Sequence, residues 1–167
     1  RKRFLMNILL ANYYGIEKGG SQKSTYQLGK ALAERGHSVF IASTGSYKDV
    51  PVKNFGKFPL PLPSIQKGQL TPVLKKIIEK EKIEIVNPQD RLTSFAGVKA
   101  AKETGAVSVV HFRDYWFACT NSTCLTKNLE PWTGEFYDFV NSFPLQRVPW
   151  EMMKAGEIEK NIPLLKE

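Results

Sequence analysis

Four short aliphatic runs, separated by stretches with helical periodicity, constrain the fold of this chain more than any other feature. The runs cover residues 6–11, 39–42, 83–86 and 107–110, and each has the length of a buried strand. Alternating strands and helices require crossover connections, which bring successive strands into one parallel sheet. The sequence therefore predicts an α/β fold: a Rossmann-like, doubly wound, mainly parallel sheet with helices on both faces.

Three helices are expected between these strands. Ser21 is placed to cap the first helix, which ends at Gly36. Thr71 and Pro72 have the residue types of a helix cap and a first helical position, so they predict the start of the second helix. The third helix is predicted over residues 94–103, with Gly105 after its end.

Two regions depart from this alternation. Residues 58–63 carry proline at every second position, which predicts an extended connection. Residues 116–150 are aromatic and aperiodic, so we expect a loop region laid against the sheet edge. Residues 151–167 are helical in composition up to Pro163. We predict one domain over residues 1–167.

The composition excludes several protein classes. Hydrophobic residues make up 42% of the chain and charged residues 24%, as in an ordinary globular protein, and no apolar run approaches the roughly 20 residues of a membrane span. We expect a cytoplasmic protein. The formal net charge of +8 favours acidic partners, namely nucleic acid, an anionic membrane surface or a phosphorylated small molecule. The lysines are scattered over expected outer helix faces, so a solvated surface explains the charge as well.

A glycine pair, Gly19 and Gly20, stands between the first strand and the first helix. Ligands of open α/β sheets bind at this edge, where a helix N-terminus offers unpaired N–H groups and glycine permits close approach. An ordinary turn into a helix is the alternative interpretation. A P-loop is excluded because Ser21 occupies the position of its lysine, and a dinucleotide fingerprint is excluded because the second strand ends in Ser43 and Thr44 rather than an acid.

Few side chains suggest other chemistry. His111 lies near the carboxyl end of a predicted strand, where it either lines a cleft or has a structural role. Cys119 and Cys124 could join His111 at a metal, but the chain has only two histidines and a closed zinc site needs four ligands, so we expect no metal. In a cytoplasmic protein, free thiols are expected rather than a disulfide.

Three segments resemble family-four glycosyltransferases, which are retaining enzymes of the two-domain GT-B fold. MNILLANYYGIEKGGSQKSTYQLGKALAERGHSVFIAST resembles the opening of their N-terminal domain. IEIVNPQD lies where the family has a "dIVhvHn" strand, and GVKAAKETGAVSVVHFRDYWFAC is similar to its "aakk.gip.v.t.HDyw..C" segment. The resemblance spans most of residues 6–124, in the family's order and spacing.

The resemblance implies transfer of a sugar from a nucleotide-sugar donor, with no further cofactor, to a sugar, a lipid-linked acceptor or another acceptor. By analogy the chain is the acceptor-side, N-terminal half of the enzyme, and the C-terminal donor-binding domain is not in these 167 residues, so we expect the isolated chain to be inactive. Gly19 and Gly20 would approach the donor diphosphate across the cleft between the two halves. We also expect Ser21, Arg113, Asp114 and Tyr115 to bind substrate, although Tyr115 could instead cover the sheet. The resemblance assigns no catalytic residue; His111 and Asp114 are the candidates.

Two positions depart from the family pattern. Arg113 stands where the family commonly has the histidine before Asp-Tyr-Trp, and the other histidine-bearing strand end reads Asn87-Pro88-Gln89-Asp90 here. Arg113 could instead contact an acidic acceptor or a phosphate as a fixed bidentate donor. The alternative function is a non-enzymatic anion- or nucleic-acid-binding α/β module, motivated by the charge alone, although we do not expect nucleic acid as a partner.

Overall fold

The computed structural model describes residues 5–56 and 63–165, and the chain divides into two compact units. The first unit comprises residues 1–61 and 65–113, and the second comprises residues 62–64 and 114–167. Each unit is described by itself. The prediction of one domain over residues 1–167 stays a prediction.

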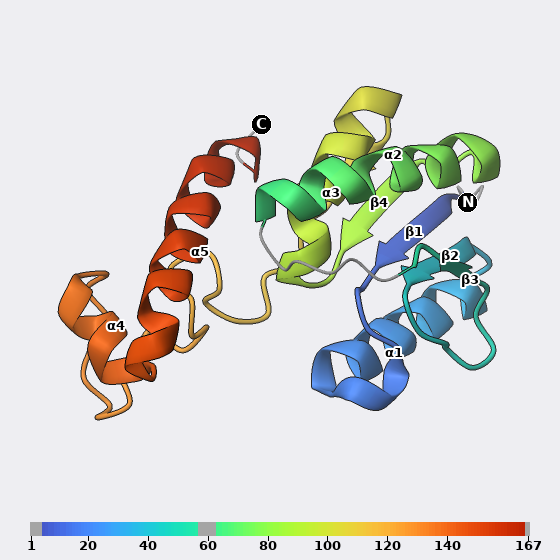
Figure 1. Cartoon of the computed structure of the whole chain (residues 1–167). Helices are drawn as coiled ribbons and strands as arrows, with labels where there is room; N and C mark the ends of the chain where they lie inside the picture. The colour runs from blue at the N-terminus through green and yellow to red at the C-terminus, as the bar shows by residue number, and fades with distance from the viewer. Residues whose placement is uncertain (1–4, 57–62, 166–167) are drawn as a thin grey trace. The chain divides into compact units, whose positions relative to one another are not determined.

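The first unit is built on a five-stranded parallel sheet of order β3-β2-β1-β4-β5 (Figure 1). The strands are β1 (Asn7–Ala11), β2 (Ser38–Ser43), β3 (Val52–Asn54), β4 (Ile85–Pro88) and β5 (Val107–Ser108). The register pairs Leu9 with Phe40 on one side and with Val86 on the other. The predicted α/β class and parallel sheet are confirmed. The three-residue strand β3 has no apolar pattern of its own and was not predicted.

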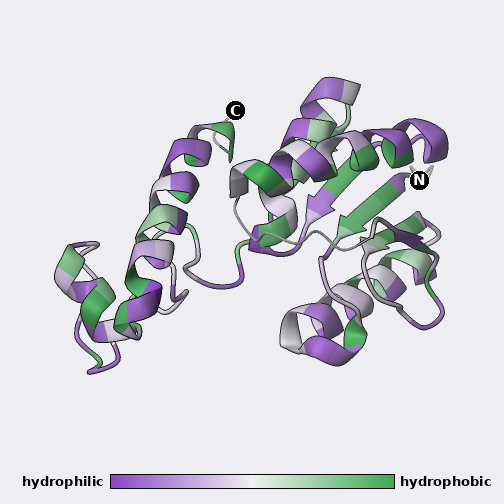
Figure 2. Cartoon of the chain, viewed as in Figure 1, coloured by the Kyte–Doolittle hydropathy of each residue, from purple (hydrophilic) through white to green (hydrophobic). Residues whose placement is uncertain are grey.

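The side chains of β1 alternate between two cores, as the period of a strand requires. Figure 2 shows the largely hydrophobic colouring of the ribbon along β1 and β4. Ile8 and Leu10 pack on the face covered by α1 (Gly20–Glu34), with Leu28 and Leu32 of that helix. Leu9 and Ala11 pack on the opposite face, which is covered by α2 (Pro63–Glu81) and α3 (Arg91–Thr104). Helices on both faces make the sheet doubly wound, as predicted.

The predicted start of α2 is wrong. The helix begins at Pro63, and Pro72 lies inside it. Leu70 and Leu74 are fully buried one turn apart against the sheet, and the Thr71 hydroxyl donates to the Lys67 carbonyl at 2.5 Å. Burial of this apolar face therefore outweighs the backbone hydrogen bond that proline removes. The predicted extended connection over residues 58–63 lies outside the described residues except for Pro63, where the helix begins.

The other two helix starts also differ from the prediction. Gly19, not Ser21, is the N-cap of α1, and Ser21 lies within the helix. The helix α3 begins at Arg91, three residues earlier than predicted, because the Asp90 side chain caps it by accepting the Thr93 N–H at 2.9 Å. Gly105, in the left-handed conformation, ends α3 as expected.

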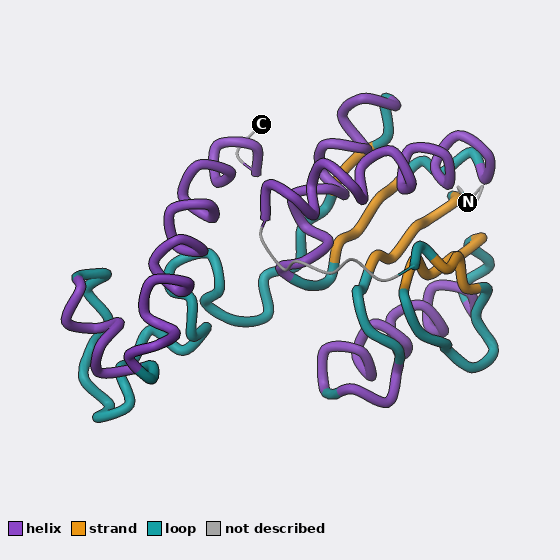
Figure 3. Tube along the Cα trace, viewed as in Figure 1, coloured by secondary structure: helices purple, strands orange, loops and turns teal. Residues whose placement is uncertain are grey.

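Within residues 116–150, where a loop region was predicted, the structure has the helix α4 (Phe136–Ser142) and the 3-10 segment η2 (Leu145–Arg147) (Figure 3). The helix α5 (Val148–Asn161) and the 3-10 segment η3 (Ile162–Leu165) follow, and they confirm the helix predicted from residue 151 up to Pro163, although α5 begins three residues earlier. The prediction is wrong for 136–142 because seven residues are too few to show a helical period, whereas burial of Phe139 and Asp138 fixes the turn. Residues 111–135 are irregular, with one isolated bridge between Leu125 and Pro131, as expected.

No helix among residues 5–56 and 63–165 has the length and apolar character needed to cross a membrane.

Candidate functional site

The strand order reverses between β1 and β4, so this is the point where open α/β sheets bind ligands, outside the carboxyl ends of the strands. The last predicted strand, around Val107, is not a neighbour of β1, since β4 lies between β1 and β5. The residues after β1 and β4, together with the start of α1, therefore form the candidate site.

The Asp90 carboxylate closes one side of this switch point. Its Oδ2 accepts the Tyr13 N–H at 2.6 Å, and its Oδ1 accepts the Thr93 N–H at 2.9 Å and the Thr93 hydroxyl at 3.0 Å. Desolvation raises the pKa of Asp90, and the hydrogen bonds from Tyr13 and Thr93 act against that rise. The side chain thus supplies the negative group that the N-terminus of α3 favours, and it ties that helix to the chain leaving β1.

The N-terminus of α1, by contrast, has no side-chain cap. Gly19 is its N-cap with extended backbone, and this cap makes no side-chain hydrogen bond. A Cβ at Gly20 would meet no heavy atom within 4 Å, so neither packing nor conformation demands a glycine there. A helix N-terminus without a side-chain cap leaves backbone N–H groups unpaired, and such groups can bind an anion.

Ser21 connects this helix to both neighbouring strands. Its hydroxyl accepts the Asn12 amide at 3.2 Å and donates to the Gln89 carbonyl at 3.4 Å. Asn12 is fully buried and also donates to the Thr25 hydroxyl at 2.9 Å, while its Oδ1 accepts the Gln22 amide at 3.1 Å. This buried polar cluster holds the first turn of α1 against β1. It was not predicted, because Asn12 and Gln22 gave no signal beyond their place beside the glycine pair.

Arg113 reaches the same site through Gln89. An Arg113 Nη2–H donates to Gln89 Oε1, the Gln89 amide donates to Asn87 Oδ1, and the Asn87 amide donates to the Val109 carbonyl. The chain of hydrogen bonds fixes the orientation of both amides, and Gln89 is only 1% exposed. Gln89 belongs to the strand end 87–90 and Arg113 precedes Asp-Tyr-Trp, the two places where this sequence departs from the family pattern, and in the structure the two side chains contact each other.

Arg113 contributes a permanent positive charge at this edge of the sheet. Desolvation lowers the pKa of Arg113, although Asp90 and Tyr47 act to raise it, and the guanidinium stays protonated at neutral pH. Desolvation, with the charge of Arg113, also lowers the pKa of His111. The His111 backbone N–H donates to the Pro88 carbonyl at 3.2 Å, which places His111 next to the end of β4. A neutral imidazole and a charged guanidinium therefore stand at the carboxyl edge of the sheet.

A second glycine pair, not singled out in the sequence, forms a close backbone contact nearby. A Cβ on Gly45 would lie 2.5 Å from the Gly15 Cα, so the loops after β1 and β2 touch at glycine. A cavity of about 380 Å3 opens beside this contact. Its lining is aromatic and charged: Tyr13, Tyr14, Gly15, Glu17, Lys18, Thr44 and Gly45.

Asp114 and Tyr115, the remaining predicted site residues, belong to the second unit. Asp114 Oδ1 accepts the Trp116 N–H at 3.1 Å, and the Tyr115 side chain is 56% exposed. Cys119 and Cys124 are free thiols, as expected. Among the described residues, no three His, Cys, Asp or Glu side chains form a group that could hold a metal ion.

The chain has a doubly wound α/β fold with an uncapped helix N-terminus at its switch point, and comparison with known proteins gives its family. Residues 18–148 match the sequence model of Glycosyltransferase Family 4. The chain therefore belongs to Glycosyltransferase Family 4, and the resemblance deduced from its motifs is confirmed. No curated protein matches the chain.

Solved structures share the fold at low sequence identity. A glycosyltransferase from Rickettsia africae has a TM-score of 0.53 and 20% identity over 66% of this chain and 30% of its own. MurG from Acinetobacter baumannii has a TM-score of 0.53 and 14% identity over 75% of this chain and 43% of its own. The lipopolysaccharide outer core galactosyltransferase WaaB has a TM-score of 0.51 and 11% identity over 63% of this chain and 32% of its own. This chain thus spans between 30% and 43% of the length of these proteins.

Proposed function

We propose that this chain is the acceptor-side half of a retaining GT-B glycosyltransferase. Joined to a C-terminal donor-binding domain, it would transfer a sugar from a nucleotide-sugar donor to an acceptor. Membership of Glycosyltransferase Family 4 supports the reaction class. The observation that carries the proposal for the site is the contrast between two helix ends at one switch point: the Asp90 side chain caps α3, whereas the Gly19 N-cap of α1 makes no side-chain cap hydrogen bond.

In this proposal the donor diphosphate lies at the open end of α1. Gly19 and Gly20 would present backbone N–H groups to it, and the positive end of the helix dipole would favour its charge. Ser21 would lie beside the diphosphate without donating its hydroxyl to it, because that hydroxyl is already bonded to Asn12 and Gln89. Asp90 keeps the anion from the N-terminus of α3, since two negative groups at one helix end repel each other.

The acceptor would be recognised by Arg113, Asp114 and Tyr115. Arg113 supplies a fixed positive charge that Gln89 orients, which suits an acceptor carrying a phosphate or a carboxylate. His111 and Asp114 are the candidates for handling the acceptor proton. The lowered pKa of His111 keeps its imidazole neutral near pH 7, the state in which it can accept a proton.

The proposal includes no cofactor besides the nucleotide sugar, which is a substrate. Family membership does not favour the alternative of a non-enzymatic anion- or nucleic-acid-binding module. A cytoplasmic location with contact to an anionic membrane surface remains part of the proposal, and the net charge of +8 supports it.

Titration of the 15N-labelled chain with inorganic pyrophosphate tests the anion site. We expect the largest amide shifts at Gly19, Gly20 and Ser21. Gly20→Val should leave the fold intact, because its Cβ meets no heavy atom within 4 Å, and weaken pyrophosphate binding at least about tenfold by blocking the backbone. Gly68→Val is the matched control, since Gly68 is also helical and equally open. Equal binding by both variants would refute the site.

Activity assays test the rest of the proposal. We expect no transfer from any nucleotide sugar by the 167-residue chain alone, because donor affinity comes mainly from the other half. In the protein joined to a donor-binding domain, Arg113→Ala should raise the KM for the acceptor without unfolding the sheet. A lowered melting temperature with unchanged acceptor binding would make Arg113 structural.

A further inference from the structure

The second unit contains a cavity of its own, lined entirely by residues 116–162. Its volume is about 280 Å3, just below the roughly 300–1,000 Å3 of sites for drug-sized ligands, so it suits a single ring rather than an extended molecule. The lining comes from the irregular segment after Trp116, from α4 and from α5: Trp116, Phe117, Ala118, Cys119, Thr120, Trp132, Gly134, Phe139, Ala155, Ile158, Glu159 and Ile162.

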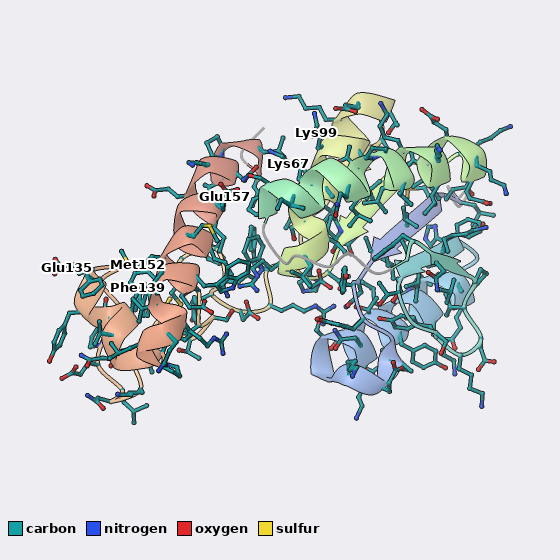
Figure 4. All side chains as sticks on the ribbon, viewed as in Figure 1. Lys67, Lys99, Glu135, Phe139, Met152 and Glu157 are labelled. Carbon is teal, nitrogen blue, oxygen red and sulfur yellow. The ribbon has the colours of Figure 1, made fainter. Side chains whose placement is uncertain are left out.

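Aromatic side chains in fixed positions form the walls. Trp132 packs edge-on against Phe139, with ring centroids 4.9 Å apart, and Trp116 packs edge-on against Phe117 at 6.2 Å. Phe139, labelled in Figure 4, comes from α4 and is 4% exposed, as is Ile158 of α5. Such packing holds the rings in one orientation, so the cavity does not need to form when a ligand enters.

The segment that carries Trp132 is also held by hydrogen bonds. Asp138 Oδ2 accepts the Thr133 N–H at 2.5 Å and the Gly134 N–H at 2.8 Å. Gly134 has a φ of +86°, and a Cβ there would lie 4.0 Å from Trp132 Nε1. A bare glycine therefore adjoins the polar edge of the indole, where a side chain would narrow the cavity.

One polar group in this cavity lacks a partner. Thr120 is 7% exposed, and its Oγ1 is buried without a hydrogen bond to any described residue. Buried hydroxyls in native proteins are almost always bonded, and an unbonded one that lines a cavity calls for a ligand or a water. Glu159, an exposed acidic residue of α5, lies on the same lining.

We propose that this cavity binds one pyranose ring of a saccharide. A pyranose has an apolar face of C–H groups that packs on an aromatic ring, and hydroxyls around its edge that need hydrogen-bond partners. Trp132 and Phe139 provide the aromatic surface, Thr120 the buried hydroxyl, and Glu159 an acceptor for the outer hydroxyls. An aliphatic chain would leave the Thr120 hydroxyl without a partner, so the lining favours the sugar. The inference deepens the proposed function, because the bound ring would belong to the acceptor.

Tryptophan fluorescence gives a direct test on the 167-residue chain. Two of its three tryptophans, Trp116 and Trp132, line the cavity, and Trp150 does not. We expect at least one methyl glycoside from a panel of glucose, galactose, mannose and N-acetylglucosamine to produce a saturable spectral change. The change should persist in Trp150→Phe.

Two substitutions attribute the change to the cavity. Thr120→Val has the same shape without the hydroxyl and should weaken binding about fivefold. Trp132→Ala should weaken it at least about tenfold, and circular dichroism checks that this variant is folded. Thr71→Val is the matched control, because Thr71 is 4% exposed, lies in the first unit and is bonded to Lys67; it should bind like the parent. If Trp132→Ala does not fold, Thr120→Val alone decides the question.

Three outcomes would overturn the inference. They are no response to any glycoside of the panel, a response to 1-octanol but not to glycosides, and glycoside binding that Thr120→Val leaves unchanged. Because the titration contains no donor and requires no turnover, its failure would leave the proposed glycosyl transfer standing. Absence of transfer in the joined enzyme would equally leave a positive titration standing.

Discussion

Gly45→Ala should destabilise this protein more than any other glycine-to-alanine change beside the candidate site. The new Cβ would lie 2.5 Å from the Gly15 Cα and 2.6 Å from the Gly15 nitrogen. The first of these distances is about 1 Å shorter than the smallest favourable carbon–carbon separation of roughly 3.5 Å. The neighbour is backbone rather than a flexible side chain, so relief requires the loop after β1 to move.

The magnitude follows from two opposing effects. Overpacking against backbone costs about 3 kcal/mol, the upper part of the usual range. Replacing glycine also restricts the unfolded chain, which stabilises the folded protein by about 0.4–1 kcal/mol. The free energy of unfolding should therefore fall by about 2–3 kcal/mol in total. For a chain of this length, this loss corresponds to a fall in melting temperature of roughly 5–10 °C.

Thermal unfolding followed by circular dichroism measures this loss, with Gly20→Ala as the matched control. Gly20 lies in the same β1–α1 region, but its Cβ would meet no heavy atom within 4 Å. The control should unfold at the parent temperature or a few degrees above it, because alanine favours the helix. A Gly45→Ala melting temperature within about 2 °C of the parent, or an equal fall in Gly20→Ala, would refute the argument from contact distances.

Three further predictions concern Leu74, Asp138 and His111. Leu74→Ala should lower the free energy of unfolding by about 2–5 kcal/mol in urea denaturation, because Leu74 is fully buried between α2 and the sheet. Burial acts to raise the pKa of Asp138, but hydrogen bonds from Thr133 and Gly134 lower it below 3.8 overall; its stabilisation is therefore present above about pH 4 and lost as the pH falls through the lowered pKa. Asp138→Asn should accordingly be less stable than the parent at pH 7, with a difference that narrows in acid. NMR titration should give His111 a pKa below 6.5, and Arg113→Ala should raise it, because removal of the guanidinium leaves only desolvation to lower it.

The sequence by itself determined the sheet and its class. The apolar runs around Leu9, Ile41 and Val86 are too short and too polar at their ends to be anything but buried strands joined by crossovers, and all three are strands. The family motifs were equally visible. The sequence also placed the glycine pair Gly19 and Gly20 between the first strand and the first helix, the edge at which open α/β sheets bind ligands.

Tertiary structure decided the features that depend on distant partners. Pro72 lies inside a helix because Leu70 and Leu74 gain more from burial than one lost hydrogen bond costs, a balance that local sequence signals do not contain. Gln89 and Arg113 are 24 residues apart, and only the fold shows that two departures from the family pattern form one hydrogen-bonded pair.

The contact of Gly15 with Gly45 and the cavity around Trp132 were likewise absent from the sequence signals. Both depend on loops whose course follows no period. Their shape comes from residues that meet across long stretches of chain, as Gly15 meets Gly45 and as Trp116 and Ile162 line one cavity. Periodicity encodes which face of an element is buried, whereas close contacts between loops arise only when the packed elements have set the distance between them.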